Sequence, residues 1–158
     1  MKHSLKTGIS FGLTSGIITT LGLMVGLYSG SRSKILVIAG IITIAISDAF
    51  SDALGIHISE ESENKHSHKE IWESTLYTFL AKFIFSSSFI VALLFFPLKA
   101  AIIINIVWGL SLLIAFNIYL AWGQKANTWK VVVEHLSIAL LVICLTHFIG
   151  KVIYTYFS

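Results

Sequence analysis

Residues 35–58 read ILVIAGIITIAISDAFSDALGIHI, a long apolar stretch. It is apolar over a length that crosses about 30 Å of hydrocarbon as a helix. It also contains two carboxylic acids, Asp48 and Asp52. Because the acids are spaced i and i+4, both project from one face of a helix. The sequence therefore predicts a transmembrane helix that carries an acidic pair inside the membrane.

The composition of the whole chain is typical of a membrane protein. Hydrophobic residues make up 56% of its 158 residues and charged residues only 12%, against roughly a quarter in soluble domains. The mean hydropathy of +0.85 excludes a soluble globular domain and implies contact with the lipid bilayer. The net charge of +3, without a basic patch interleaved with aromatics, predicts no nucleic-acid partner. A single cysteine, Cys144, excludes a disulfide within one chain.

Five apolar stretches of membrane-spanning length predict an all-α, multi-pass integral membrane bundle of five transmembrane helices, at residues 8–30, 35–58, 75–98, 100–122 and 131–157. The first is too long for a signal-peptide core, so we expect a retained helix. Pro97 predicts a tight turn from the third helix into the fourth. We treat residues 1–158 as a single transmembrane domain. Its one sizeable polar segment, residues 59–74, lies between helices two and three.

The positive charges favour a cytoplasmic N-terminus. That orientation places six lysines inside, namely Lys2, Lys6, Lys65, Lys69, Lys125 and Lys130. It leaves four basic residues outside, namely Arg32, Lys34, Lys99 and Lys151. The polar segment 59–74 is then cytoplasmic. The sequence does not say which membrane holds the protein, and in a prokaryote it would be the cell membrane.

Placing the acidic pair inside the membrane costs free energy, which suggests that the pair has a function. Each carboxylate at the centre of a bilayer costs about 2.5 to 3.5 kcal/mol on the insertion scale. Ser51 lies beside the pair, so we expect a polar groove there. Neighbouring carboxylates titrate as a coupled pair, and an arriving cation would displace their shared proton. We predict metal and proton exchange at Asp48 and Asp52; the alternative is a protonated, hydrogen-bonded pair that only clamps helices together.

The first apolar stretch supplies a face that could complete this site. Small residues recur along it at intervals of three and four, including Gly8, Gly12 and Gly16, and they permit close helix approach. Ser15 and Thr19 lie one turn apart and could lend hydroxyl oxygens to a cation held by the aspartates. The alternative is that this face only packs.

The polar segment is the second candidate for metal binding. If the second helix continues past the membrane, one stripe carries acidic and imidazole groups, with His57 adjacent: Glu60, Glu63, His66, Glu70 and Glu73. Such a mixture suits Fe, Mn, Co or Zn better than Mg or Ca. The alternative is a solvated charged loop in which Lys65 and Lys69 pair with the acids.

Other polar residues in the spans suggest no chemistry of their own. Lys82 is expected to snorkel, and the alternative is a pair with a carboxylate of the second helix. We assign no role to Glu134, His135, His147 and Lys151. Because no nucleophile and base stand at a recognisable spacing, we do not expect an enzyme.

Two stretches resemble the vacuolar iron transporter family, membrane proteins that move ferrous iron and manganese. Residues 11–26, FGLTSGIITTLGLMVG, resemble its small-residue-rich first helix, and residues 47–59, SDAFSDALGIHIS, resemble its second-helix pattern A-D-A-L-S-M-x-x-G-E-Y-x-S. Ser15 stands where the family has aspartate, Asp52 where it has methionine, and Ile56 where it has glutamate. An acidic ligand has thus moved from one helix to its neighbour. The polar segment is also shorter than the family's metal-binding region, so its glutamates are not carried over.

The resemblance implies a homodimer with the transport path between subunits and proton-coupled export of divalent metal from the cytoplasm. Our leading hypothesis is such a carrier for Fe²⁺ or Mn²⁺, with Zn²⁺ and Co²⁺ as further substrates. Its transport site would comprise Asp48, Asp52, Ser15, Thr19 and Ser51. No covalently bound cofactor is expected. The alternative is a non-transporting membrane sensor or assembly protein that uses the acidic segment.

Overall fold

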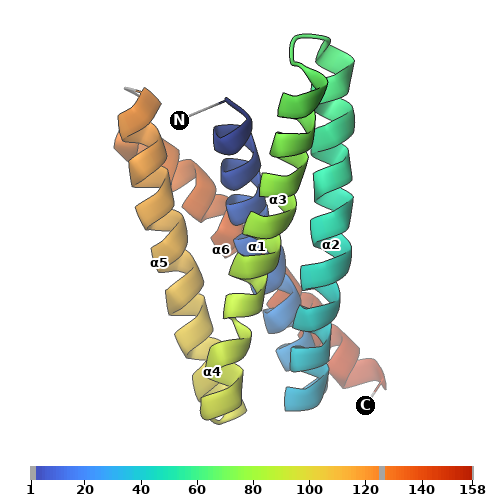
Figure 1. Ribbon diagram of the computed structural model, residues 1–158. Helices are drawn as coiled ribbons and strands as arrows, with labels where there is room; N and C mark the ends of the chain where they lie inside the picture. The colour runs from blue at the N-terminus through green and yellow to red at the C-terminus, as the bar shows by residue number, and fades with distance from the viewer. Residues whose placement is uncertain (1–2, 125–126, 158) are drawn as a thin grey trace. The chain divides into compact units, whose positions relative to one another are not determined.

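The computed structural model describes residues 3–124 and 127–157, so the predicted cytoplasmic lysines Lys2 and Lys125 lie outside the described residues. Every regular element in that part of the chain is an α-helix: α1 (His3–Ser31), α2 (Lys34–Glu63), α3 (His68–Ser88), α4 (Ile90–Phe95), α5 (Leu98–Gln124) and α6 (Thr128–Phe157) (Figure 1). The predicted all-helical class is confirmed.

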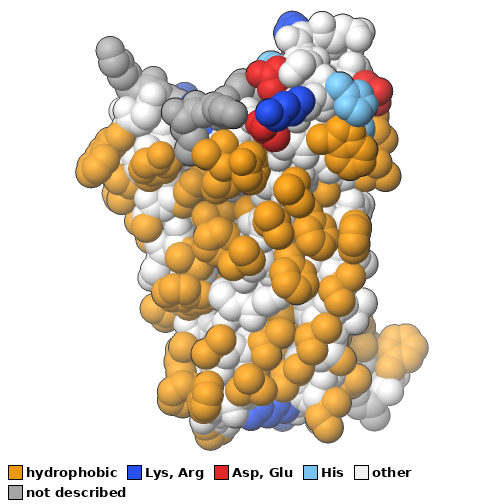
Figure 2. All heavy atoms as spheres, viewed as in Figure 1, with side chains coloured by type: hydrophobic (Ala, Val, Ile, Leu, Met, Phe, Trp, Pro, Cys, Tyr) orange, Lys and Arg blue, Asp and Glu red, His pale blue; other side chains and the backbone are white. Residues whose placement is uncertain are grey.

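Five segments are long and apolar enough to cross a membrane: Ser4–Ser31, Lys34–Glu63, His68–Phe95, Leu98–Gly123 and Thr128–Phe157. They match the five predicted spans, although the third begins earlier in the chain than expected. Figure 2 shows hydrophobic side chains along the helices and charged side chains gathered at one end of α2 and α3. Such a surface belongs in a lipid bilayer.

The ends of the helices follow from local sequence. Arg32 and Asn64 have positive φ, both 51°, directly after α1 and α2, so the chain leaves the helix there. Ser67 then starts α3 with a capping box, in which its side chain accepts from the Glu70 backbone and the Glu70 side chain accepts from the Ser67 backbone. Pro97 separates α4 from α5, as predicted.

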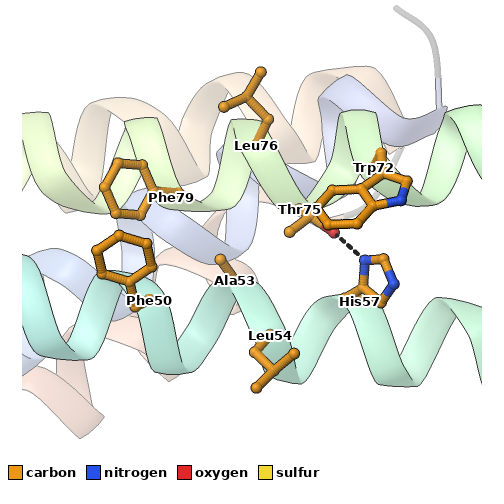
Figure 3. A pocket seen from close by; sticks show the side chains of 8 residues that line it. All are labelled: Phe50, Ala53, Leu54, His57, Trp72, Thr75, Leu76 and Phe79. Atoms are coloured by element: carbon orange, nitrogen blue, oxygen red, sulfur yellow. Dashed lines mark hydrogen bonds between the residues drawn. The ribbon is translucent and has the colours of Figure 1, made fainter.

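The chain divides into two compact units. The first comprises the chain up to Thr20 together with Ile41–Phe89, and the second comprises Leu21–Gly40 and the chain from Ile90 onward. In the first unit α2 and α3 lie side by side (Figures 1 and 3), and α1 contacts α3 through glycines. In the second unit α5 contacts both α4 and α6.

The close contact between α1 and α3 depends on Gly8, Gly12 and Gly16. A Cβ added at Gly12 would lie 2.5 Å from the carbonyl oxygen of Thr78, and one at Gly8 would lie 2.7 Å from that of Ser74. The predicted packing role of this small-residue face is thereby confirmed. Its partner is α3, and this contact sets which side chains of α3 point towards the acidic pair.

Candidate functional site

The acidic pair of α2 is joined by a lysine from α3. Lys82 Nζ lies 2.5 Å from Asp48 Oδ2 and also forms an ion pair with Asp52 Oδ2. The Lys82 side chain is 1% exposed, whereas those of Asp48 and Asp52 are 26% and 19% exposed. We call these three residues the Asp–Lys–Asp cluster. The expected snorkelling of Lys82 is wrong, because its ammonium turns inward to the carboxylates, and the alternative, an ion pair with the second helix, holds.

Ser15 of α1 completes the cluster. Its hydroxyl donates to Asp52 Oδ2 over 2.7 Å and accepts from Lys82 Nζ over 2.9 Å. The cluster and Ser15 together draw one residue from α1, two from α2 and one from α3, all within the first unit. The structure brings together three of the predicted transport-site residues, Ser15, Asp48 and Asp52.

Among the described residues, the side chains of Thr19 and Ser51, the other two predicted transport-site residues, form no hydrogen bond with Asp48, Asp52 or Lys82. Thr19 donates its hydroxyl to the Ser15 carbonyl over 2.9 Å, as a threonine within a helix commonly does. Ser51 is exposed on α2. Their predicted part in cation binding stays a prediction.

The cluster holds more acidic groups than basic groups. Two carboxyl groups face one ammonium. Removing one partner from a buried ion pair is strongly destabilising, because the remaining charge is left unpaired in a low dielectric. The cluster can therefore hold helices together and can also attract one further positive charge.

His57 lies on α2 nearer the cytoplasmic end of the predicted topology, in a separate groove. The groove has a volume of about 550 Å³ and is lined by Phe50, Ala53, Leu54, His57, Trp72, Thr75, Leu76 and Phe79 (Figure 3). Thr75 donates its hydroxyl to the Ile71 carbonyl, so it accepts from His57 Nδ1 over 2.9 Å. His57 Nε2 is then the ring nitrogen left for another partner. The imidazole ring packs in a T-shaped contact with the ring of Trp72, with centroids 4.6 Å apart.

The predicted single stripe of acidic and imidazole groups is wrong. α2 ends at Glu63, and the capping box at Ser67 starts a new helix, so Glu70 and Glu73 belong to α3. The sequence carried a signal for this in Ser67-x-x-Glu70, a capping-box spacing. We call the acidic and histidine residues at this end the acidic collar: Glu60, Glu63, His66, Glu70 and Glu73.

Each member of the acidic collar has a partner within the chain. Glu60 is 7% exposed and lies 3.4 Å from His66 Nε2. Glu63 pairs with Lys65 at 3.3 Å, as the alternative of a charged loop requires. Glu73 accepts from the Ser4 hydroxyl over 3.0 Å, and Glu70 caps α3. Over residues 3–124 and 127–157 no three His, Cys, Asp or Glu side chains gather as they would around a metal ion.

Polar residues of the second unit have partners of their own. Asn105 donates to Met24 Sδ over 3.3 Å, and Asn117 donates to the Leu113 carbonyl over 2.8 Å. His147 Nδ1 lies 2.6 Å from the Ser29 hydroxyl, and His135 Nδ1 lies 2.9 Å from the Val131 carbonyl. These contacts give the two histidines structural roles.

The fold and the cluster define a multi-pass integral membrane protein with ionisable groups inside its apolar helices, an arrangement typical of ion pathways. The family model described as VIT family matches residues 8–72, from α1 to the beginning of α3. The match covers fewer than half of the 158 residues, and it contains both stretches that resemble the vacuolar iron transporter family, residues 11–26 and 47–59. No curated protein and no solved structure matches the chain.

Proposed function

We propose that the protein transports a divalent transition metal, Fe²⁺ or Mn²⁺, out of the cytoplasm in exchange for protons. The observation that carries this proposal is the acidic pair in the middle of α2, whose two carboxylates face a single ammonium. A site within apolar helices that holds more carboxyl groups than ammonium groups attracts a passing cation. Carboxylate and hydroxyl oxygens, as Asp48, Asp52 and Ser15 offer them, are ligands for hard divalent cations.

In this proposal the acidic collar attracts cations from the cytoplasm. Carboxylates and imidazoles at one end of α2 and α3 attract cations and raise their local concentration (Figure 2). His57 stands between the collar and the cluster along α2, with Nε2 as a transient ligand. A homodimer with the path between its subunits follows from the family resemblance, and Zn²⁺ and Co²⁺ are further substrates to test.

Radiotracer flux tests this proposal. Proteoliposomes with the purified protein are given ⁵⁴Mn²⁺ or ⁵⁵Fe²⁺ on one side, with and without an imposed pH gradient, and empty liposomes serve as the blank. We expect protein-dependent metal flux that rises when the pH gradient drives protons in the direction opposite to that of the metal. Metal flux that is the same with and without the pH gradient contradicts proton coupling. Metal flux equal to that of empty liposomes contradicts transport.

A second candidate function is a non-transporting membrane protein that senses metal or binds a partner through the acidic collar. One observation favours it, since the ion pairs of Lys82 give the two aspartates a structural reason to be kept. Metal binding without flux, lost on changing Glu60 and Glu63 but kept on changing Asp48, selects this function.

A further inference from the structure

The ammonium of Lys82 sits where a cation would have to bind. Lys82 Nζ donates hydrogen bonds to Asp52 Oδ2 and Ser15 Oγ and forms an ion pair with Asp48 Oδ2 at 2.5 Å, so three oxygens surround it. These oxygens come from two different helices, α1 and α2, and the lysine reaches them from a third. They are also the oxygens that a hard divalent cation would take as ligands.

We propose that Lys82 is a tethered occupant of the cation site, so that a divalent cation binds only after the ammonium has left the three oxygens. This inference rests on the proposed function, and it adds that the Lys82 ammonium regulates access of the metal to the cation site. Lys82 is a positioning and gating residue here, not a metal ligand. It lies beyond residues 8–72, the segment that the family model matches.

Charge explains why lysine and metal exclude one another. The two carboxylates carry two negative charges, which one divalent cation neutralises by itself. With the ammonium also present, the cluster would carry an excess positive charge at a side chain that is 1% exposed. Like charges held in a low dielectric repel strongly, so occupancy by metal and occupancy by Lys82 are alternatives.

The packing around Lys82 suits a side chain that changes position. A Cβ built on Gly16 would lie 3.2 Å from Lys82 Cγ, so the absence of a side chain there makes room for the lysine stem. That stem is a chain of four methylenes, so rotation about its bonds can carry the ammonium away from the oxygens without a shift of α3. A shorter or rigid cation could not withdraw from the oxygens in this way.

The experiment removes the tethered cation and asks whether metal takes its place. Purified full-length protein is made with Lys82→Met, which keeps the apolar stem, and with Lys130→Met, which removes an exposed lysine as a matched control. Thermal unfolding and Mn²⁺ binding are measured in detergent, with Mn²⁺ or with EDTA. We expect Lys82→Met to unfold at a lower temperature than wild type in EDTA, to regain stability in Mn²⁺, and to bind Mn²⁺ at least about tenfold more tightly than wild type.

Two further variants keep the test decisive. Lys82→Gln serves if Lys82→Met does not fold, and Asp52→Asn combined with Lys82→Met should lose the gain in Mn²⁺ affinity. Equal Mn²⁺ affinity in wild type and Lys82→Met overturns the proposal. So does aggregation of both Lys82 variants in Mn²⁺ as well as in EDTA, because Mn²⁺ should fill a vacated site. This test measures binding and stability, not flux, so it is independent of the test of transport. If Lys82→Met binds Mn²⁺ more tightly than wild type but wild type shows no flux, the proposed transport is contradicted and the occupancy of the site by Lys82 is supported.

Discussion

Replacement of Gly12 by alanine should disrupt the contact that positions Lys82. The added Cβ would lie 2.5 Å from the Thr78 carbonyl oxygen, 3.0 Å from Ala81 Cβ and 3.1 Å from the Lys82 backbone nitrogen. Two of these three atoms belong to the backbone of α3, which cannot yield as the end of a flexible side chain can. The helix itself must move away from α1.

The expected cost follows from two opposing effects. Overpacking a close contact costs about 1–3 kcal/mol, and alanine gains up to about 1 kcal/mol over glycine within a helix. Because the contact is with backbone, we expect the upper part of the range and a net loss of about 2 kcal/mol. For a chain of this length that corresponds to a fall of about 4–8 °C in the unfolding temperature.

Gly55 provides the matched control. It lies on α2, and a Cβ built there meets nothing within 4 Å. Gly55→Ala should therefore raise the free energy of unfolding by up to about 1 kcal/mol. Both variants are unfolded thermally in detergent and followed by tryptophan fluorescence, and their metal flux is measured in proteoliposomes. Gly12→Ala should also reduce flux, because the displaced α3 carries Lys82 with it.

Equal stability of Gly12→Ala and Gly55→Ala would contradict this prediction. That result would mean that α1 and α3 do not approach closely at Gly12. A destabilised Gly12→Ala protein with unchanged flux would keep the packing argument and remove its link to the Asp–Lys–Asp cluster.

Three further predictions concern the cluster and the turn before α3. Ser15→Ala removes a donor to Asp52 and an acceptor of Lys82, so it should cost about 1–3 kcal/mol of stability, and a thermal melt equal to wild type would refute this. Asn64→Val forces a β-branched residue to φ 51° and should cost about 1–2 kcal/mol, whereas Asn64→Gly should melt like wild type. Ser67→Ala removes the N-cap of α3 and should cost about 1 kcal/mol without reducing flux, so a loss of flux beyond the loss of folded protein would contradict a purely capping role.

Much of the fold was accessible from the sequence because hydrocarbon thickness fixes the length of a span. The five apolar stretches and the turn at Pro97 both appear in the structure. The third span is predicted to begin at residue 75, whereas α3 begins at His68, because the first turns of α3 carry the charged residues Lys69, Glu70 and Glu73. The capping box at Ser67 would have corrected that boundary.

The pairing within the candidate site could be predicted only in part. The spacing of Asp48 and Asp52 places both on one face of α2 whatever surrounds them. The partner of that face depends on how α3 is rotated, and this rotation follows from the glycine contacts of α1, which are long-range. The sequence alone therefore predicts snorkelling for Lys82, and only the packing of α3 against α1 and α2 shows its ion pairs.

If a cation passes the acidic pair of α2, metal flux must depend on its two carboxyl groups. The decisive experiment measures ⁵⁴Mn²⁺ flux through proteoliposomes that contain either wild type or Asp48→Asn combined with Asp52→Asn. Since the double variant strands the Lys82 ammonium, the same change is also made together with Lys82→Met, and Glu134→Gln on α6 serves as an exposed acidic control. The account predicts folded protein without flux when both aspartates are lost, and wild-type flux in Glu134→Gln. Undiminished flux through the variant that lacks both carboxylates would contradict it.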